Sequence, residues 1–260
     1  MRSNLLASLR LLCLVLGLAV CAGAVAQGKP PIVAAASDLK FAVTEIAARF
    51  EADTGRKVTL NFGSSGNFAR QIQQGAPFEL FMSADEAFVF KLADAGLTRD
   101  RGELYAIGRI VLYVPKGSAL KLDAELKGVQ AGWSQVRKFA IANPEHAPYG
   151  RAAEEALRKL QLWELVKPKL VLGENISQAA QFVTTRGAEV GIIALSLALA
   201  HELAREGEHV LLPESLHNPL RQRMVLTRNA GETARQFYDY LRHPAARSVL
   251  RKYGFVLPGE

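Results

Sequence analysis

Cysteine is nearly absent from this chain of 260 residues, which contains only Cys13 and Cys21. Both lie in an amino-terminal segment with the pattern of an export signal, so the mature protein is expected to contain none. Their absence excludes disulfides, thiolate metal sites and cysteine nucleophiles. The remaining residues, about 234, are enough to bury a stabilising core without a covalent crosslink.

The predicted signal peptide covers residues 1–26. Its apolar run at residues 11–20 is shorter than the ~20 residues that a membrane-spanning helix needs. Residues 24–26 read Ala-Val-Ala, the pattern of a cleavage site, so the mature chain is expected to begin at Gln27. Acylation of Cys21, as in a lipoprotein, is the alternative; cleavage is favoured because a bulky valine precedes this cysteine. No later segment is long and apolar enough to span a bilayer, so a soluble periplasmic protein is expected.

The charge excludes one large class of partner. The formal net charge is +7, or +5 once Arg2 and Arg10 of the signal are removed. The basic residues are scattered along the chain, without the arginine-rich stripe and interleaved aromatics of a nucleic-acid-binding protein. Nucleic acid is therefore not expected as a partner, whereas a mildly positive field favours the approach of small anions.

Short apolar stretches alternate with helical patterns from residue 31 onward, which predicts an α/β fold with mostly parallel strands. The expected strands are residues 31–36, 57–62, 80–83, 109–114, 139–142, 169–172, 190–194 and 221–226. The expected helices are residues 39–54, 67–74, 85–95, 150–160, 176–186, 195–205, 232–241 and 245–253. This length permits one large domain or two small lobes.

Three strand-to-helix junctions are rich in small polar residues: residues 36–38, 63–66 and 173–177. Ligands of open α/β sheets bind at the carboxyl ends of strands, where helix N-termini present unpaired amides and partial positive charge. If the three junctions point inward, they form a neutral cage of hydrogen-bond donors for an anion. Taken singly, each is more simply a helix cap, with Asn175 favoured over Ser177 as the cap of the third helix.

Catalytic signatures are missing. The chain has no Gly-x-Ser-x-Gly elbow and no phosphate-binding loop, and its five histidines have no metal-ligand spacing. Asp85 and Glu86 are adjacent carboxylates at an expected helix start, where acidic residues suit the helix dipole without any catalysis. An enzyme, a cofactor and a protein-bound metal are therefore not expected.

Several stretches follow one another in a specific order along nearly the whole mature chain. They are AAAS at residues 34–37, GSSG at 63–66, QIQQGAPFELF at 71–81, SAD at 83–85, NPEHAPYG at 143–150, GENI at 173–176, FYDYL at 237–241 and YGF at 253–255. Together they resemble the periplasmic molybdate-binding proteins, which are the solute receptors of molybdate ABC importers. The resemblance implies a monomer that captures molybdate, and also tungstate, and delivers it to an ABC-type permease of the inner membrane.

The same resemblance implies the type II periplasmic-binding-protein fold. In this fold two α/β lobes, each with a mixed and mainly parallel sheet, are joined by two crossing hinge strands, and the ligand lies between the lobes. The crossings are expected near residues 110–114 and 221–225. Lobe 1 then comprises residues 27–112 and 223–260, and lobe 2 comprises residues 113–222.

Carried over by position, the resemblance assigns five residues to the ligand. Ser37 and Ser65 supply hydroxyls and amides, and the amide of Asp38 is a further contact. Ile176 supplies a backbone amide, so its apolar side chain is no obstacle. Tyr149 supplies a hydroxyl, as in the branch of the family that has tyrosine in the Pro-x-Gly motif.

Two positions, Ala194 and Asp38, are unusual for this kind of site. The expected strand that ends at Ala194 lacks the tyrosine that donates in the other branch, and Tyr149 is expected to replace it. Asp38 is discordant, because a carboxylate beside a dianion costs roughly 1 kcal/mol per unit charge at about 4 Å in water, and more when buried. Its side chain is therefore expected to turn outward or to cap the helix. If it pointed inward, it could accept a proton and would suit hydrogen phosphate better than molybdate.

Molybdate at neutral pH is an unprotonated tetrahedral dianion, which accepts hydrogen bonds and donates none. A cage of donors satisfies it, and the smaller sulfate cannot fill the same donor set. Another oxyanion, such as sulfate or phosphate, is the alternative ligand. An exported enzyme on the same scaffold is the alternative class of protein.

Overall fold

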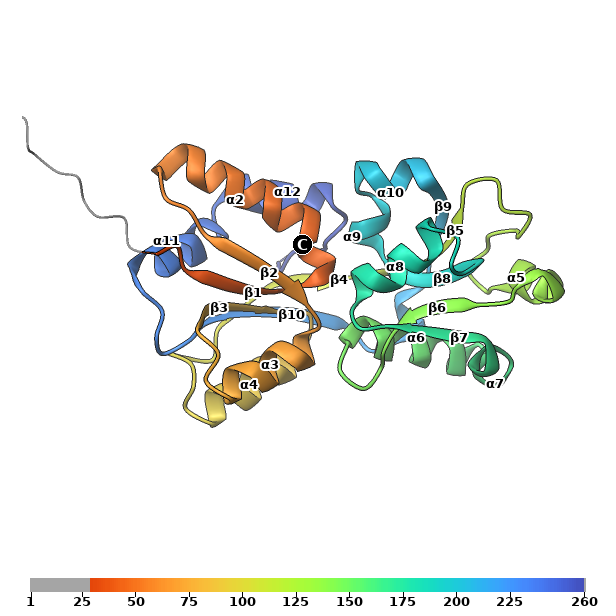
Figure 1. Ribbon diagram of the computed structural model, residues 1–260, viewed down its shortest axis with the longest axis horizontal. Coiled ribbons are helices and arrows are strands. Elements are labelled where there is room, and N and C mark those ends of the chain that lie inside the picture. Colours follow the sequence, from red (N-terminus) through yellow and green to blue (C-terminus); the bar gives the residue numbers. More distant parts are fainter. Residues whose placement is uncertain (1–28, 260) are drawn as a thin grey trace, which may run out of the picture. The chain divides into compact units, whose positions relative to one another are not determined.

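The computed structural model describes residues 29–259 (Figure 1). Residues 1–28 and Glu260 lie outside the described residues, and with them the predicted signal peptide, its cleavage site and both cysteines. The chain forms one compact unit from Pro31 onward. No helix within residues 29–259 combines the length and the apolar character needed to cross a membrane.

The strands form two five-stranded sheets. The first has the order β2-β1-β3-β10-β4, built from β1 Ile32–Ala36, β2 Thr59–Gly63, β3 Phe78–Ser83, β4 Glu103–Gly108 and β10 Leu220–Leu226. The second has the order β7-β6-β8-β5-β9, built from β5 Ile110–Pro115, β6 Phe139–Ala142, β7 Leu170–Gly173, β8 Val190–Ala194 and β9 Gly207–Leu211. In each sheet the fourth strand, β10 or β5, runs in the direction opposite to the other four strands. The predicted mixed and mainly parallel α/β architecture is confirmed.

Helices connect the strands and cover the sheets. The α-helices are α2 Lys40–Thr54, α3 Ser65–Gln73, α4 Glu86–Asp94, α5 Lys127–Ala131, α6 Pro148–Lys159, α7 Trp163–Val166, α8 Ile176–Thr184, α9 Leu195–Ala198, α10 His201–Glu206, α11 Glu232–Tyr240 and α12 Pro244–Lys252. The 3-10 helices are η1 Ser37–Leu39, η2 Trp133–Gln135, η3 Lys167–Lys169 and η4 Glu214–Leu216. On the first sheet α2, α11 and α12 lie on one face, and α3 and α4 on the other (Figure 1).

The interior strand β1 is buried on both faces, because helices cover both. Val33 belongs to the core that includes Phe50 and Phe237, whose rings meet edge to face with centroids 5.1 Å apart. Its neighbour Ala34 belongs to a second core with Phe81. Successive side chains of a strand point to opposite faces, so an unbroken apolar run is what a strand between two helical layers requires. This packing holds the carboxyl end of β1 in place.

The short helices α5 and α7 were not predicted, and two further parts of the secondary structure also differ from the prediction. The expected helix at residues 195–205 is interrupted, since α9 ends at Ala198 and α10 begins at His201. Strands β4 and β9 were not predicted at all. Both lie at a sheet edge and are only partly buried, so their sequences carry no continuous apolar run.

The chain passes between the sheets twice. Arg109 alone separates β4 in the first sheet from β5 in the second. The return runs through residues 212–219, between β9 and β10. The predicted lobe limits at residues 112/113 and 222/223 fall inside β5 and β10, each of which lies wholly in one sheet.

Candidate functional site

Four helix N-termini meet around one small cavity. Its lining residues are Ala36, Ser37, Asp38, Gly63, Ser64, Ser65, Ala84, Ala147, Pro148, Tyr149 and Ile176. They come from the starts of η1, α3, α6 and α8, from the ends of β1 and β2, and from the residue after β3. All five residues predicted for the site lie here, and each is at most 3% exposed.

Ser37 follows β1 directly and connects this junction to α8. The amide of Ser177 donates to Ser37 Oγ at 3.2 Å, and Ser177 Oγ donates to the Ser37 carbonyl at 2.8 Å. A hydroxyl that accepts from a protein amide keeps its own proton for another acceptor. The side chain of Ser37 is therefore set up to donate. Ser177 thus links α8 to Ser37. From the sequence Ser177 is only a possible helix cap, and this contact was not predicted.

Ser65 is the first residue of α3, and its hydroxyl accepts from a backbone amide as that of Ser37 does. Its Oγ accepts from the amide of Ala84 at 2.9 Å, which leaves the hydroxyl proton free to donate. The neighbouring Ser64 holds the N-cap position without a side-chain cap bond, and its Oγ lies 3.0 Å from His146 Nδ1. Ser65 thus has the geometry of a ligand donor, and Ser64 has that of a bridge to the α6 junction.

Gly66 is needed because two backbone segments approach closely. Its amide donates to the carbonyl of His146 at 3.0 Å. A Cβ atom at Gly66 would lie 2.7 Å from that carbonyl oxygen, too close for any other residue. The glycine thus permits a backbone contact between the first turn of α3 and the loop before α6.

The start of α8 is capped as predicted. Asn175 holds the N-cap, and its side chain accepts from the amide of Gln178 at 3.1 Å. Ile176 follows as the first helical residue, so its amide precedes the intrahelical hydrogen bonds and is available to a ligand. Its side chain is buried among apolar residues.

The expectation that the Asp38 side chain turns outward or caps a helix is wrong. Asp38 is 1% exposed and makes no side-chain cap bond. Its Oδ2 accepts from Tyr149 Oη at 3.0 Å and from Gln222 Nε2 at 2.6 Å. Its Oδ1 is buried without a hydrogen-bond partner among the described residues. Burial raises the pKa of Asp38 from its ordinary 3.8 to about 6, although the bonds from Gln222 and Tyr149 and the nearby backbone amides of Asp38 and Leu39 act in the opposite direction.

The hydroxyl of Tyr149 is engaged with protein groups. It donates to Asp38 and accepts from Gln222 Nε2 at 3.0 Å. Burial raises the pKa of Tyr149 well above its ordinary value, and the negative charge of Asp38 adds to this. The ring lines the cavity, and direct donation of this hydroxyl to a ligand stays a prediction.

Two residues of this network were not found from the sequence. Gln222 is fully buried, and its Oε1 accepts from Tyr105 Oη at 2.8 Å. A signal was present, because Leu220, Gln222 and Met224 share the buried face of β10 by their spacing of two. An amide between two apolar positions on one strand face indicates a buried polar partner.

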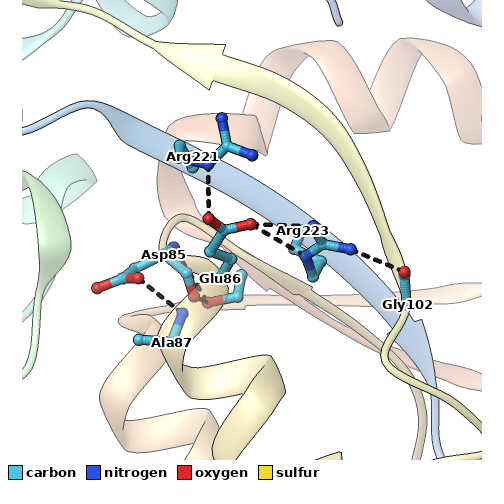
Figure 2. A network of polar contacts seen from close by, with 7 residues as sticks. Asp85, Glu86, Ala87, Gly102, Arg221 and Arg223 are labelled. Atoms are coloured by element: carbon cyan, nitrogen blue, oxygen red, sulfur yellow. Dashed lines mark hydrogen bonds and ion pairs between the residues drawn. The ribbon is translucent and has the colours of Figure 1, made fainter.

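The cationic neighbours of Gln222 turn away from the cavity. Figure 2 shows Glu86 between Arg221 and Arg223, and the Arg223–Glu86 contact measures 3.0 Å. Asp85 caps α4 by accepting from the amide of Ala87 at 2.8 Å, as expected for acidic residues at a helix start. Among the described lining residues of the cavity none is lysine, arginine or histidine. Nor do histidines and carboxylates gather into a metal-binding group anywhere in residues 29–259.

A cavity of hydroxyl and amide donors with one buried carboxyl, at the strand ends of two α/β sheets, is the arrangement of a protein that binds a small solute anion. The comparisons with known proteins agree. The chain matches the bacterial extracellular solute-binding proteins over residues 32–256, and it belongs to this family.

Within this family, the chain is similar to several molybdate-binding proteins. The chain is 38% identical over 255 residues to the molybdate-binding protein ModA of Rhodobacter capsulatus, with 94% of each chain covered. It is 39% identical over 251 residues to ModA of Azotobacter vinelandii, with 93% of this chain and 94% of the relative covered. The solved periplasmic molybdate-binding protein of Azotobacter vinelandii matches with a TM-score of 0.81 at 30% identity, over 88% of this chain and 100% of that one. The resemblance read from the sequence is confirmed.

Proposed function

We propose that this protein captures molybdate outside the cytoplasm and delivers it to an ABC-type permease. One observation carries the proposal: four helix N-termini surround a buried cavity with neutral donors and no cationic side chain among the described lining residues. The names of the relatives support the choice of anion. Tungstate has the same shape and charge and is expected to bind in the same way.

The chemistry follows from the donors. Molybdate only accepts hydrogen bonds, and helix N-termini supply amides and partial positive charge without a counter-ion. The hydroxyls of Ser37 and Ser65 each accept from a protein amide, so their protons are directed to a ligand. The amides of Asp38 and Ile176 complete the proposed set. These groups contact the oxygens of the anion and do not coordinate the metal. Tyr149 lines the cavity but donates its single hydroxyl proton to Asp38, so it is proposed to act on the anion through that carboxyl.

Binding is proposed to accompany closure of two lobes, residues 27–112 with 223–260 and residues 113–222. Three hydrogen bonds support this because they join residues near the first sheet to residues near the second. They are Ser177 to Ser37, Tyr149 to Asp38, and Ser196 Oγ to the Asp38 carbonyl at 2.7 Å. Opening would break these bonds, so a ligand that adds bonds to the same groups shifts the population toward the closed state.

Location and partners are part of the proposal. Residues 1–26 are proposed as a cleaved signal peptide, with lipid anchoring at Cys21 as the alternative. The protein is proposed to act as a periplasmic monomer without enzymatic activity or a cofactor. Its partner is the permease of the inner membrane, which reads the closed, loaded form.

One observation favours a second candidate, binding of a protonated oxyanion such as hydrogen phosphate. The unpartnered Oδ1 of buried Asp38 could accept the proton of such an anion. Sulfate has no such proton and remains a candidate only through its tetrahedral shape.

Calorimetry on the mature chain, residues 27–260, distinguishes these ligands. Molybdate and tungstate are expected to bind at least about a hundredfold more tightly than sulfate or phosphate, a difference of about 2.7 kcal/mol. Equal affinity for sulfate would contradict the proposal, and tighter binding of phosphate would select the second candidate.

A further inference from the structure

We propose that the protein binds molybdate together with one proton, which lies between the anion and Oδ1 of Asp38. This inference rests on the proposed function and adds that the affinity for the anion depends on pH. It assigns to Asp38 a direct role that goes beyond its backbone amide.

The geometry leaves one oxygen of Asp38 for the ligand. The carboxyl is 1% exposed and belongs to the cavity lining. Oδ2 already accepts from Tyr149 and Gln222. Oδ1 has no hydrogen-bond partner among the described residues, and a buried polar atom without a partner is costly. A ligand in the cavity is therefore the group that Oδ1 is left to meet.

Gln222 positions the proton. Its Oε1 accepts from Tyr105 Oη at 2.8 Å, which directs its Nε2 toward Asp38. Gln222 Nε2 and Tyr149 Oη both donate to Oδ2, so Oδ2 is held as an acceptor. A proton bound by the carboxyl then lies on Oδ1, where it can be donated to an oxygen of the anion.

The groups that face Asp38 from the packed elements are neutral. They are Tyr149 from α6, Gln222 from β10, Tyr105 from β4 through Gln222, and Ser196 from α9. Only the two tyrosines among them titrate, and burial raises the pKa of both well above the ordinary value. Neither tyrosine therefore supplies or removes charge near neutral pH.

The charged groups on these elements pair elsewhere. Arg151 of α6 contacts Asp85, and Arg221 and Arg223 of β10 contact Glu86. His146, in the loop before α6, contacts Ser64 with Nδ1, and its Nε2 lies 3.5 Å from Glu174. Among the described residues, no cation is placed to neutralise Asp38.

Charge balance then favours uptake of a proton. An ionised Asp38 beside a molybdate dianion would put three negative charges in a buried site without a counter-ion. A proton taken from solvent lowers this to two and converts the unpartnered Oδ1 into a donor. Because the pKa of Asp38 is raised to about 6, by burial that outweighs its hydrogen bonds, the carboxyl of the free protein is mostly ionised at pH 7.5 and must take up this proton when the anion binds.

Calorimetry of the mature protein with sodium molybdate tests the inference. Titrations at pH 7.5 in two buffers with different ionisation enthalpies report the protons taken up, and close to one proton per anion is expected. The affinity of the wild type is expected to fall by up to about tenfold per pH unit between pH 7 and 8.5. Asp38→Asn should lose this dependence, with a change below about twofold over the same range. Asp94→Asn, a change at an exposed carboxylate paired with Arg101, serves as the matched control and should retain it.

Each outcome has one reading. Pronounced proton uptake in the wild type supports the inference without any variant, so a failure of Asp38→Asn to fold does not remove the test. Molybdate binding with constant affinity and no proton uptake overturns it, as does an equal pH dependence in Asp38→Asn. Hydrogen phosphate that binds more tightly than molybdate counts against the proposed function and selects its second candidate, because Asp38 then receives the proton of the ligand. No binding of molybdate at any pH would instead refute the proposed function.

Discussion

Gln222 donates a 2.6 Å hydrogen bond to the carboxyl of Asp38, 184 positions earlier in the chain. The bond joins the central region of β10 to the first turn after β1, beside the cavity. It holds a buried carboxyl in a site otherwise made of neutral donors.

Replacing Gln222 with leucine should destabilise the protein. The change leaves Tyr105 Oη without its buried partner and Asp38 Oδ2 with Tyr149 alone, and a loss of about 1–3 kcal/mol in the free energy of unfolding is expected. Urea unfolding of the ligand-free protein at pH 7.5 measures it. Gln236→Leu is the control, since within residues 29–259 that side chain bonds to Glu232 on the surface, and it should cost less than about 0.5 kcal/mol. Equal losses would show that Gln222 is not a specific support.

The stability of the wild type should depend on pH through Asp38. Its pKa is raised from 3.8 to about 6 in the folded protein, so the folded state binds the proton more tightly than the unfolded state. The corresponding stability is fully present below about pH 4 and is lost as pH rises through about 6. Asp38→Asn removes this loss and should be more stable than the wild type by about 2–3 kcal/mol at pH 7.5. Denaturant unfolding at pH 4.5 and 7.5 should show the difference growing with pH; a constant difference would contradict the assignment.

Removing either serine hydroxyl should weaken molybdate binding. Ser37→Ala or Ser65→Ala deletes a donor to a charged ligand, worth about 1.5–3 kcal/mol, so the affinity should fall by about 10–150-fold. Calorimetry at pH 7 provides the affinity. Ser248→Ala is a suitable control, because its hydroxyl donates to the Ala245 carbonyl on the exposed side of α12. Unchanged affinity in both site variants would mean that the donors are assigned wrongly.

Gly66→Ala should separate the α3 junction from the α6 junction. The added Cβ would lie 2.7 Å from the His146 carbonyl, and backbone atoms cannot move aside easily. The amide bond from Gly66 to His146 should break, and molybdate affinity should fall by about tenfold or more, which corresponds to about 1.4 kcal/mol.

Gly231→Ala is the matched control for that change. Its nearest contact is the flexible Glu79 carboxylate at 3.3 Å, and the affinity should stay unchanged. A similar loss of affinity in both variants would show that the effect does not come from the approach of Gly66 to His146.

Much of the fold could be predicted because local sequence carries it. The apolar run that became β1 and the helical spacing that became α2 are each encoded within a few turns or strands of chain. The edge strand β9 was missed since half-exposed strands need little apolar sequence. The break between α9 and α10 leaves only a weak signal in a segment that is helical on either side.

In the candidate site, too, local contacts could be predicted from the sequence and long-range contacts could not. Capping by Asn175 was predicted because a cap is a contact within four residues. The inward position of Asp38 was not predicted, since an isolated carboxylate is expected to seek water. Its accommodation depends on Tyr149 and Gln222, which come from other helices and strands.

The amino-acid sequence by itself determined the alternation of strands and helices, the absence of cysteine after residue 21, and the small polar residues at the strand-to-helix junctions. These features depend on composition and on neighbours along the chain. The tertiary structure alone decided which junctions share a cavity and which protein groups surround the Asp38 carboxyl. Burial and hydrogen-bond partners, which set the protonation of that carboxyl, come from segments more than 100 residues away in the sequence.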